Sequence, residues 1–183
     1  TLNRGETLGL VGESGSGKST VARMAVRLLA PSAGDVLLDG VSIFDRDKAV
    51  QSSLPGRLQM VFQDPYSSLN PRMRVGTSIG ESLACAGVPA GTRREKVARL
   101  LEQVGLDPDY ARRFPHEFSG GQRQRMAVAR ALAPEPDIVV CDEPVSSLDA
   151  WVQAQVLNLL KDTQERLGLS YLFISHDLAV VSH

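Results

Sequence analysis

The chain has 183 residues, of which 43% are hydrophobic and 22% are charged, so it is long enough for one globular domain and too apolar to be disordered. The formal net charge of −1 argues against nucleic-acid binding by bulk electrostatics. No apolar run approaches the roughly 20 residues that a membrane-spanning helix needs, and no signal peptide is visible. These features predict that any work at a membrane is done as a peripheral subunit.

The two cysteines, Cys85 and Cys141, lack metal-ligand or CxxC spacing, and Cys141 lies in an apolar run that predicts a buried free thiol. A reducing, cytosolic compartment is therefore favoured. The sequence begins at Thr1 without a start methionine and stops at His183 within a stretch of helical spacing. We expect the chain to be part of a longer polypeptide.

The first motif is GESGSGKST, which fits the GxxxxGK(S/T) pattern of a phosphate-binding loop. Thr7–Val11 before it is predicted to be an apolar strand, and a helix is predicted after it, with one apolar face formed by Val21, Met24, Ala25, Leu28 and Leu29. Lys18 would supply positive charge to the β- and γ-phosphates, and Ser19 a hydroxyl for Mg²⁺. A flexible Gly/Ser linker, the alternative, leaves the flanking strand and helix unexplained. The residues expected to bind the nucleotide here are Gly12, Glu13, Ser14, Gly15, Ser16, Gly17, Lys18, Ser19 and Thr20.

Strands and helices alternate through the rest of the chain, which predicts an α/β fold with a mainly parallel sheet. The expected strands are Asp35–Asp39, Val41–Phe44, Leu58–Phe62, Asp137–Cys141 and Ser170–Ile174. Helices are expected from Ser119 to about Ala133 and from Ala150 to Leu167, and Asp64–Arg74 is expected to be a loop.

The stretch Val75–Phe114 carries helical spacing and no strand signal, so we expect a helical insertion in the α/β core. Two arginine pairs lie within it, Arg93/Arg94 and Arg112/Arg113. Solvated helix faces are the favoured interpretation of these pairs, ahead of binding patches.

Four residues lie just past the ends of predicted strands: Gly12, Gln63, Asp142 and His176. Because ligands bind at the carboxyl ends of parallel strands, we expect these residues to share one site. Asp142 is placed to hold Mg²⁺, and Glu143 to orient or deprotonate a water that attacks the γ-phosphate. An exposed acidic turn is the alternative for this acidic pair. Gln63 and His176 are weak signals when each is taken alone.

Ser119-Gly120-Gly121 is a second glycine-rich helix start, and it has no lysine. One interpretation is an anion site that caps a phosphate held by another copy of the protein. The other is a simple helix N-cap made by Ser119. The residues alone do not choose between the two.

Taken in order, the motifs resemble those of the ATP-binding cassette (ABC) ATPases over nearly the whole chain. They are GESGSGKST, Gln63, FSGGQRQR (118–125), IVVCDEP (138–144), SSLD (146–149) and His176. The stretch Val61–Met73 is most similar to ATPase subunits of bacterial oligopeptide, dipeptide and nickel uptake systems. The resemblance implies a phosphate-loop NTPase (RecA-like) core of residues 1–66 and 116–183, with a partial antiparallel β lobe. It also implies an inserted helical subdomain, 67–115, in a single truncated domain, 1–183, with the signature motif at their junction.

The resemblance also implies residue roles. Glu143 would be the catalytic glutamate, aided by Lys18, Gln63 and His176. The Mg²⁺ ligands would be Ser19, Gln63 and Asp142. The γ-phosphate bound to a second ABC subunit would be contacted by Ser119, Gly120, Gly121 and Gln122, and Asp149 would cross the dimer interface.

The function implied is MgATP hydrolysis that powers solute import, of peptide or nickel, through a nucleotide-sandwich dimer. The dimer could be homo- or heteromeric, and import over export rests on the resemblance alone. Transmembrane permease subunits would dock on the helical subdomain and the Gln63 region, a solute-binding protein would act indirectly, and no nucleic acid would bind. The location implied is the cytoplasmic side of the inner membrane.

Two other classes of phosphate-loop protein fit the motifs less well. A soluble ABC ATPase acting on ribosomes or DNA would show a second cassette, a basic linker or a coiled-coil insertion. A GTPase would carry an NKxD motif, which is missing from the sequence, and neither a GTPase nor a small-molecule kinase explains SGGQ.

The sequence departs from the family pattern in three places. Phe118 replaces the commonest leucine, SSLD replaces SALD, and no aromatic residue occurs in residues 1–11, where the family stacks adenine upstream of the phosphate loop. A lost base stack costs roughly 1–3 kcal/mol. We therefore expect residues 1–183 alone to bind MgATP more weakly than the full subunit and to hydrolyse it slowly.

Overall fold

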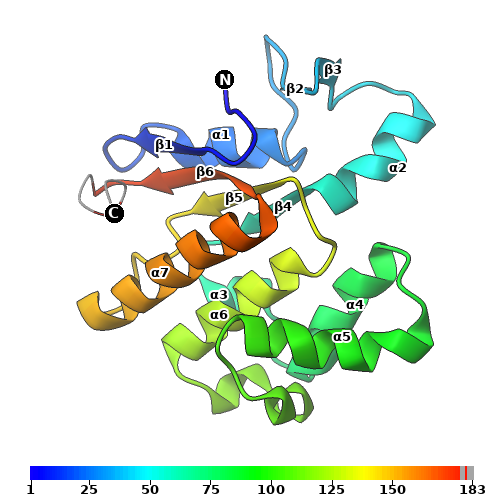
Figure 1. Cartoon of the computed structure of the whole chain (residues 1–183). Coiled ribbons are helices and arrows are strands. Elements are labelled where there is room, and N and C mark those ends of the chain that lie inside the picture. Colours follow the sequence, from blue (N-terminus) through cyan, green and yellow to red (C-terminus); the bar gives the residue numbers. More distant parts are fainter. Residues whose placement is uncertain (178–179, 181–183) are drawn as a thin grey trace.

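The computed structural model describes residues 1–177 and 180, apart from the side chains of residues 66 and 67. The helical stretch expected at the end of the chain lies outside the described residues. A parallel sheet forms the centre of the fold, with helices on both of its faces (Figure 1). The predicted α/β architecture is confirmed.

The main sheet has four parallel strands in the order β1-β6-β5-β4. Their bounds are Thr7–Val11 for β1, Ser170–Ser175 for β6, Ile138–Asp142 for β5 and Leu58–Val61 for β4. Asp142 pairs with Ile174, and Val11 pairs with Ser175, so these strand ends lie at the same edge of the sheet. Four segments that are distant in the sequence therefore leave the sheet side by side.

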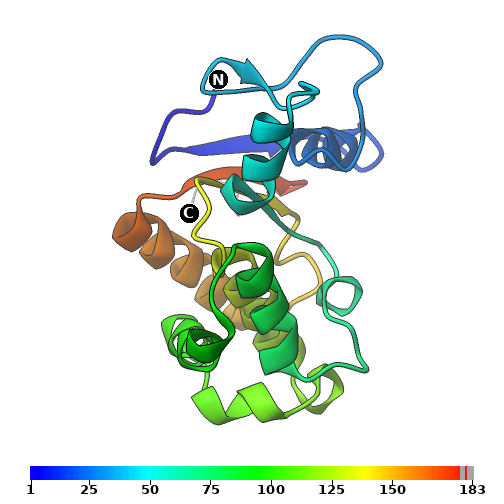
Figure 2. The ribbon, with the colours of Figure 1, turned by 90° about the vertical axis from the view of Figure 1, so that its right-hand side faces the viewer.

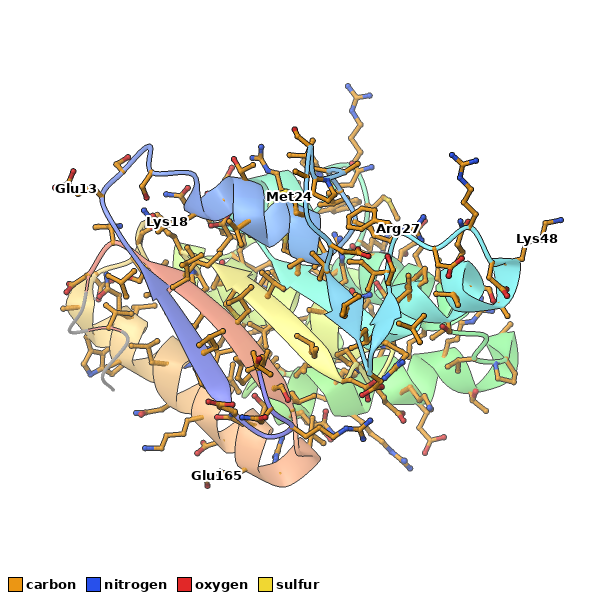
Figure 3. All side chains as sticks on the ribbon, turned by 90° about the horizontal axis from the view of Figure 1, so that it is seen from above. Glu13, Lys18, Met24, Arg27, Lys48 and Glu165 are labelled. Carbon is orange, nitrogen blue, oxygen red and sulfur yellow. The ribbon has the colours of Figure 1, made fainter. Side chains whose placement is uncertain are left out.

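Helix α1 (Lys18–Ala25) lies on one face of the sheet, and α6 (Gly120–Leu132) and α7 (Ala150–Leu167) lie on the other (Figure 3). Lys18 stands at the end of α1 nearest to the loop that follows β1. The middle strands are covered on both faces, as the almost fully buried Val139 and Val140 show. Cys141 is buried and free, as expected, and burial raises the pKa of its thiol.

The apolar face predicted for the first helix is wrong in part. The helix ends at Ala25, and Arg27 has a left-handed backbone with φ 61°, so it cannot continue the turn. Val21, Leu28 and Leu29 are 42%, 61% and 44% exposed. The helix instead packs through Ala22, which lies among Val140 and Ile174 of the sheet. A small residue at this contact lets the helix approach the strands closely.

Two helices occur where the sequence predicted none. Helix α2 (Lys48–Arg57) has Pro55 in its last turns and no clear apolar period, but Asp47 caps it by accepting from the Ala49 N–H, and Leu54 is buried. A short α3 (Pro65–Ser68) interrupts the expected loop. The small antiparallel pair, β2 (Leu37–Leu38) and β3 (Val41–Ser42), is present as predicted and is shorter.

The stretch between β4 and α6 is helical, and the described residues of 75–114 contain no strand. It forms α4 (Val75–Cys85), α5 (Ala90–Gln103) and the 3₁₀ turns η1 (Pro108–Arg112) and η2 (Pro115–Glu117). These helices lie below the sheet in Figure 2. One cluster of buried side chains runs from β4 and β6 through α6 into α4 and α5, so both parts share a core. None of the helices in the described part is long and apolar enough to cross a membrane.

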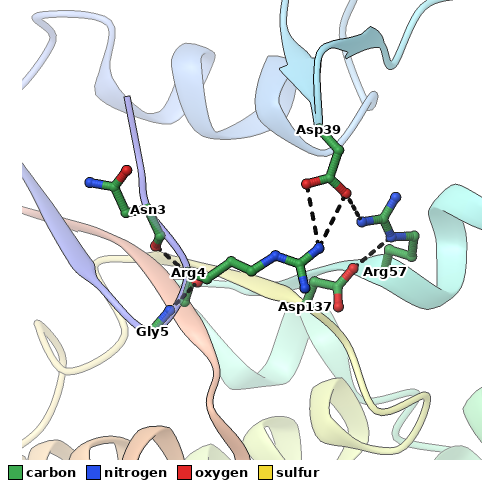
Figure 4. A network of polar contacts seen from close by, with 7 residues as sticks. Asn3, Arg4, Gly5, Asp39, Arg57 and Asp137 are labelled. Carbon is green, nitrogen blue, oxygen red and sulfur yellow. Dashed lines mark hydrogen bonds and ion pairs between the residues drawn. The ribbon is translucent and has the colours of Figure 1, made fainter.

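A network of charged side chains joins the start of the chain to the small sheet and to β5 (Figure 4). Arg57 donates from Nε to Asp137 at 2.6 Å and also pairs with Asp39, which lies 3.5 Å from Arg4. The Arg57 guanidinium holds the pKa of the Asp39 carboxyl below its usual range. These pairs are partly exposed and screened by solvent, so each contributes little to stability.

Candidate functional site

The phosphate loop leaves β1 and turns sharply into α1. Gly15 and Gly17 have φ values of 82° and 96°, a left-handed conformation that residues with a Cβ rarely adopt. Gly17 is the N-cap of α1, with no side-chain cap and no acidic residue in the first turn. The N–H groups at this helix end are therefore open to an anion, and the helix dipole favours one.

Lys18 lies within the loop and is 7% exposed. Its Nζ donates to the carbonyl oxygens of Gly12 and Glu13, both at 2.7 Å. An ammonium group has three donors, so these two bonds hold it at the centre of the loop and leave one donor for a ligand. The loop thus positions a full positive charge beside the open helix end.

Asp142, the last residue of β5, faces the start of α1. The Ser19 hydroxyl donates to Asp142 Oδ1 at 3.0 Å. Burial raises the pKa of Asp142, and the Ser19 hydrogen bond opposes that shift. A nearby cation would favour the ionised carboxylate. A hydroxyl and a carboxylate oxygen are the donors that Mg²⁺ prefers, so the pair fits this ion.

Glu143 is the hub of the polar contacts at this edge. Its Oε2 accepts from Gln63 Nε2 at 3.2 Å and lies 3.1 Å from His176 Nδ1. The Glu143 side chain is 15% exposed, whereas that of His176 is 53% exposed. Three predicted residues from three different strand ends are thus brought into direct contact.

The backbone of Glu143 is left-handed, with φ 47°, and its N–H donates to the Ile174 carbonyl at 3.0 Å. Such a conformation costs a residue other than glycine of order 1–3 kcal/mol and persists only where the surroundings impose it. Pairing with the end of β6 imposes it here. From this backbone the Glu143 carboxylate contacts both Gln63 and His176.

Ser146 was not predicted to take part. Its hydroxyl accepts from Gln63 Nε2 at 3.3 Å and donates to the Glu143 carbonyl at 3.2 Å. Ser146 therefore ties Gln63 to the backbone of the acidic turn. Ser146 is the first residue of the SSLD motif, but a hydroxyl three residues after Glu143 is common in turns and does not by itself indicate a contact with Gln63.

These groups surround one cavity of about 520 Å³. The residues that line it are Ser14, Gly15, Gly17, Lys18, Ser19, Thr20, Gln63, Glu143 and His176. Every one of them was predicted as a site residue. Gly12, Glu13, Ser16 and Asp142 do not line the cavity; Gly12 and Glu13 hold Lys18 through their carbonyl groups, and Asp142 lies behind Ser19.

The second glycine-rich helix start is not part of this cavity. Ser119 is the N-cap of α6; its hydroxyl accepts from the Gln122 N–H at 3.3 Å, and Gln122 Oε1 accepts from the Ser119 N–H at 3.0 Å. Asp149 caps α7 by accepting from the Val152 N–H at 3.0 Å. The N-cap predicted as one alternative is present, and the structure does not bring Ser119–Gln122 or Asp149 to the phosphate loop of the same chain.

Close packing holds this second group of residues together. A Cβ added at Gly121 would lie 2.4 Å from Val152 Cγ1, and one added at Gly120 would lie 3.4 Å from Leu148 Cδ2. Trp151, the single tryptophan of the sequence, is in the first turn of α7 and is 72% exposed. A large apolar side chain therefore stands in solvent beside the Asp149 cap.

Residues 1–146 match the family described as ABC transporter. The chain belongs to the ABC transporter family. The resemblance expected from the motifs is thereby confirmed.

Curated relatives of this ABC chain include bacterial proteins with import names. A protein of Brucella abortus (strain 2308), provisionally named as a peptide import ATP-binding protein, is 62% identical over 185 residues, which cover 99% of this chain and 55% of the relative. One of Brucella ovis with the same kind of name is 53% identical, covering 100% of this chain and 58% of the relative. The chain thus spans little more than half the length of the curated relatives it matches.

Solved structures of ABC proteins share the fold. The cbiO1 protein of Clostridium perfringens, part of the ABC transporter complex cbiONQ, aligns with a TM-score of 0.86 and 29% identity, over 98% of this chain and 70% of that chain. The ATP-binding cassette MJ0796, in a dimeric post-hydrolysis state bound to ADP and Pi, aligns with a TM-score of 0.84 and 30% identity. That alignment covers 98% of this chain and 78% of the cassette.

Proposed function

We propose that this chain is the ATP-binding and ATP-hydrolysing domain of an ABC import protein, and that its full-length form powers uptake of a solute, peptide or nickel. The observation that carries the proposal is the contact of Glu143 with Gln63 and His176 beside an open phosphate loop. The import names of the Brucella relatives support a peptide cargo over nickel.

In this proposal the loop Gly12–Thr20 binds the phosphates of ATP through its N–H groups and Lys18. Glu143 takes a proton from the attacking water, and Gln63 and His176 hold the Glu143 carboxylate and the water in place. Ser19, Gln63 and Asp142 would hold Mg²⁺, which supplies charge neutralisation at the β- and γ-phosphates when bound. The Gln63 amide fits this double role because its Nε2 donates to Glu143 and its oxygen remains an acceptor.

The same proposal assigns Ser119–Gln122 and Asp149 to the nucleotide of a second ABC subunit. Support comes from their position away from the chain's own cavity and from the dimeric state of the MJ0796 cassette. We further propose a core of residues 1–66 and 116–183, and a helical subdomain, 67–115, that docks a transmembrane permease together with the Gln63 region. The complex would lie peripherally on the cytoplasmic side of the inner membrane, and a solute-binding protein would act on it only indirectly.

The test of catalysis is Glu143→Gln. Glutamine keeps an acceptor oxygen for Gln63 but cannot take a proton, so hydrolysis is expected to fall by about 10²–10⁴-fold. MgATP binding, measured by calorimetry, should stay within about threefold of the parent. Glu165→Gln, on the exposed face of α7, is the matched control and should leave both values unchanged. Near-normal turnover in Glu143→Gln would remove Glu143 from its role.

The test of the second subunit's contribution is Ser119→Arg. An added guanidinium at the start of α6 should block closure of two copies, so ATP-dependent dimers should disappear in light scattering. ATP binding to the same chain should persist, because Ser119 does not line the chain's own cavity. Loss of binding by the monomer would show that Ser119–Gln122 serve their own chain instead.

A further inference from the structure

A second cavity lies on the helical part of the chain, between α4, α5 and η1, and has a volume of about 380 Å³. Arginine side chains dominate its polar lining: Arg74, Arg93, Arg94 and Arg112, against the single acid Asp109. We call it the arginine groove. It shares no lining residue with the phosphate cavity, and α4 and α5 pack side by side to form it (Figure 1).

Two of the four arginines are fixed in place by backbone carbonyl groups. Arg74 Nη1 donates to the Arg112 carbonyl at 2.9 Å, and its guanidinium lies 5.5 Å from the centre of the Phe114 ring. Arg93 Nε donates to the Val88 carbonyl at 2.7 Å. A guanidinium has five N–H donors, so each retains several for a ligand while its position is already set.

Arg94 and Arg112 are exposed, and among the described residues their side chains have no hydrogen bond or ion pair. Arg57, Arg99 and Arg113 each pair with an acid, whereas Arg46, like Arg94 and Arg112, is exposed and has no ion pair among the described residues. Arg94 and Arg112 are exposed, as a solvated face predicts, whereas Arg113 pairs with Glu117. Among the described residues none of the four arginines of the groove has an ion pair, and the groove holds one carboxylate, that of Asp109, so its excess of positive charge favours an anion.

Gly80, in the interior of α4, also lines the groove. A Cβ added there would meet nothing within 4 Å, so the folded chain itself does not need glycine at this position. Gly76, one turn earlier, differs, because a Cβ there would lie 2.8 Å from the Ala111 carbonyl oxygen. A glycine in a helix interior costs about 1 kcal/mol relative to alanine. The open space at Gly80 would let the backbone of another molecule approach α4 closely.

The positive charges lie toward both ends of the groove. Arg74 precedes α4 and contacts Arg112, whereas Arg93 and Arg94 lie in the first turn of α5, beyond the short connection at the other end of α4. Six residues of helix separate Arg74 from Gly80, which is about 9 Å along the axis. An extended peptide of about three residues covers the distance from the Arg74 end of the groove to Gly80.

We propose that the arginine groove binds an acidic segment of a partner protein, which places carboxylates at both ends and its backbone over Gly80. The charge complementarity of the groove carries this inference. The identification of that partner as a membrane subunit of the same transporter rests on the proposed function. The preference of the groove for an acidic segment does not depend on that function.

The experiment measures binding to the intact protein of a short, blocked, dye-labelled peptide that carries a pair of glutamates at each end. Fluorescence anisotropy at low salt is the readout, and a glutamine version is the matched peptide. We expect the glutamate peptide to bind and the glutamine peptide not to bind. Arg94→Glu should weaken binding about fivefold or more, and Gly80→Leu, which fills open space, about tenfold. Arg46→Glu, an exposed and unpaired arginine elsewhere, is the charge-matched control and should change affinity less than twofold.

Equal binding of the two peptides, or equal losses in Arg94→Glu and Arg46→Glu, would overturn the inference. So would Arg94-dependent binding of inorganic phosphate alone, or of phosphatidylglycerol vesicles, at a strength that matches the peptide, because the groove would then take any anion or a lipid surface. MgATP binding is measured on every variant and should be unchanged. A parent that binds the peptide but no MgATP would end the proposed function and leave the groove standing.

Discussion

The chain contains two glycine-rich helix starts, and the structure gives them opposite states. Before α1, Gly17 has a left-handed backbone and leaves the first N–H groups without a side-chain partner. Before α6, Ser119 is extended, and its side chain and that of Gln122 satisfy each other's N–H groups. The start of α1 is open to a ligand that the same chain binds, whereas the start of α6 is already capped by side chains.

The difference teaches that glycine content does not define an anion site; the residue at the N-cap does. A glycine at that position has no side chain to fill the site, whereas a serine supplies the first acceptor itself. An anion at the start of α6 would add to, or displace, the bonds between Ser119 and Gln122. This arrangement is consistent with a weaker contact between the start of α6 and a nucleotide that a second subunit holds.

Lys18→Ala is expected to have the largest effect, because it removes the full charge that only the open start has. MgATP affinity should fall by about 100-fold or more, which corresponds to about 2.7 kcal/mol. Lys48→Ala, at the exposed start of α2, should leave affinity unchanged and serves as the control. Calorimetric titration checks both, and a loss below threefold in Lys18→Ala would break the comparison.

Gly121→Ala tests the packing of the capped start. Its Cβ would lie 2.4 Å from Val152 Cγ1, and overpacking of this kind costs about 1–3 kcal/mol of unfolding free energy. Gly120→Ala meets Leu148 only at 3.4 Å and should be near neutral, since alanine also favours the helix. Denaturant unfolding of both variants measures the contrast. Equal stability would mean that α6 shifts freely on α7.

Asp142→Asn is expected to have the smallest effect on the nucleotide-free protein. It tests whether binding of MgATP at the start of α1 also requires the Asp142 carboxylate. Burial raises the folded-state pKa of Asp142, so the ionised carboxylate is a cost at neutral pH that asparagine removes. Without nucleotide, the melting temperature should not fall below that of the parent. Any advantage of the variant should shrink as the pH falls through the raised pKa, because the parent then becomes neutral too.

With MgATP present, the order of the two proteins should reverse. The parent should gain thermal stability, and Asp142→Asn should lose most of that gain. A variant that keeps the full gain would show that Asp142 is not needed for the metal-bound nucleotide.

The motif-bearing part of the fold could be predicted because each local signal agrees with the tertiary structure. A strand followed by a glycine loop, or by two acids, fixes where the chain leaves the sheet, and parallel pairing then brings Gly12, Gln63, Asp142 and His176 to one edge. That rule accounts for Gln63 and His176 in the lining of the phosphate cavity, and the glycine-loop motif accounts for most of the rest.

Other features could not be read from the sequence, because distant contacts determine them. Helix α2 contains a proline and lacks an apolar period, and it forms around the Asp47 cap and the buried Leu54. The first helix ends at Ala25 because Arg27 has a left-handed backbone, which the apolar spacing of the sequence does not reveal. The left-handed backbone of Glu143 depends on its bond to Ile174 in the neighbouring strand, which no local pattern encodes.

The exposed indole of Trp151 has a practical consequence. Tryptophan emission shifts when solvent is excluded, and this chain has one such fluorophore, placed two residues after Asp149. The protein therefore carries a native optical reporter next to the loop that a second copy is proposed to cover. Association could be followed in real time, without attached dyes, on the unmodified polypeptide.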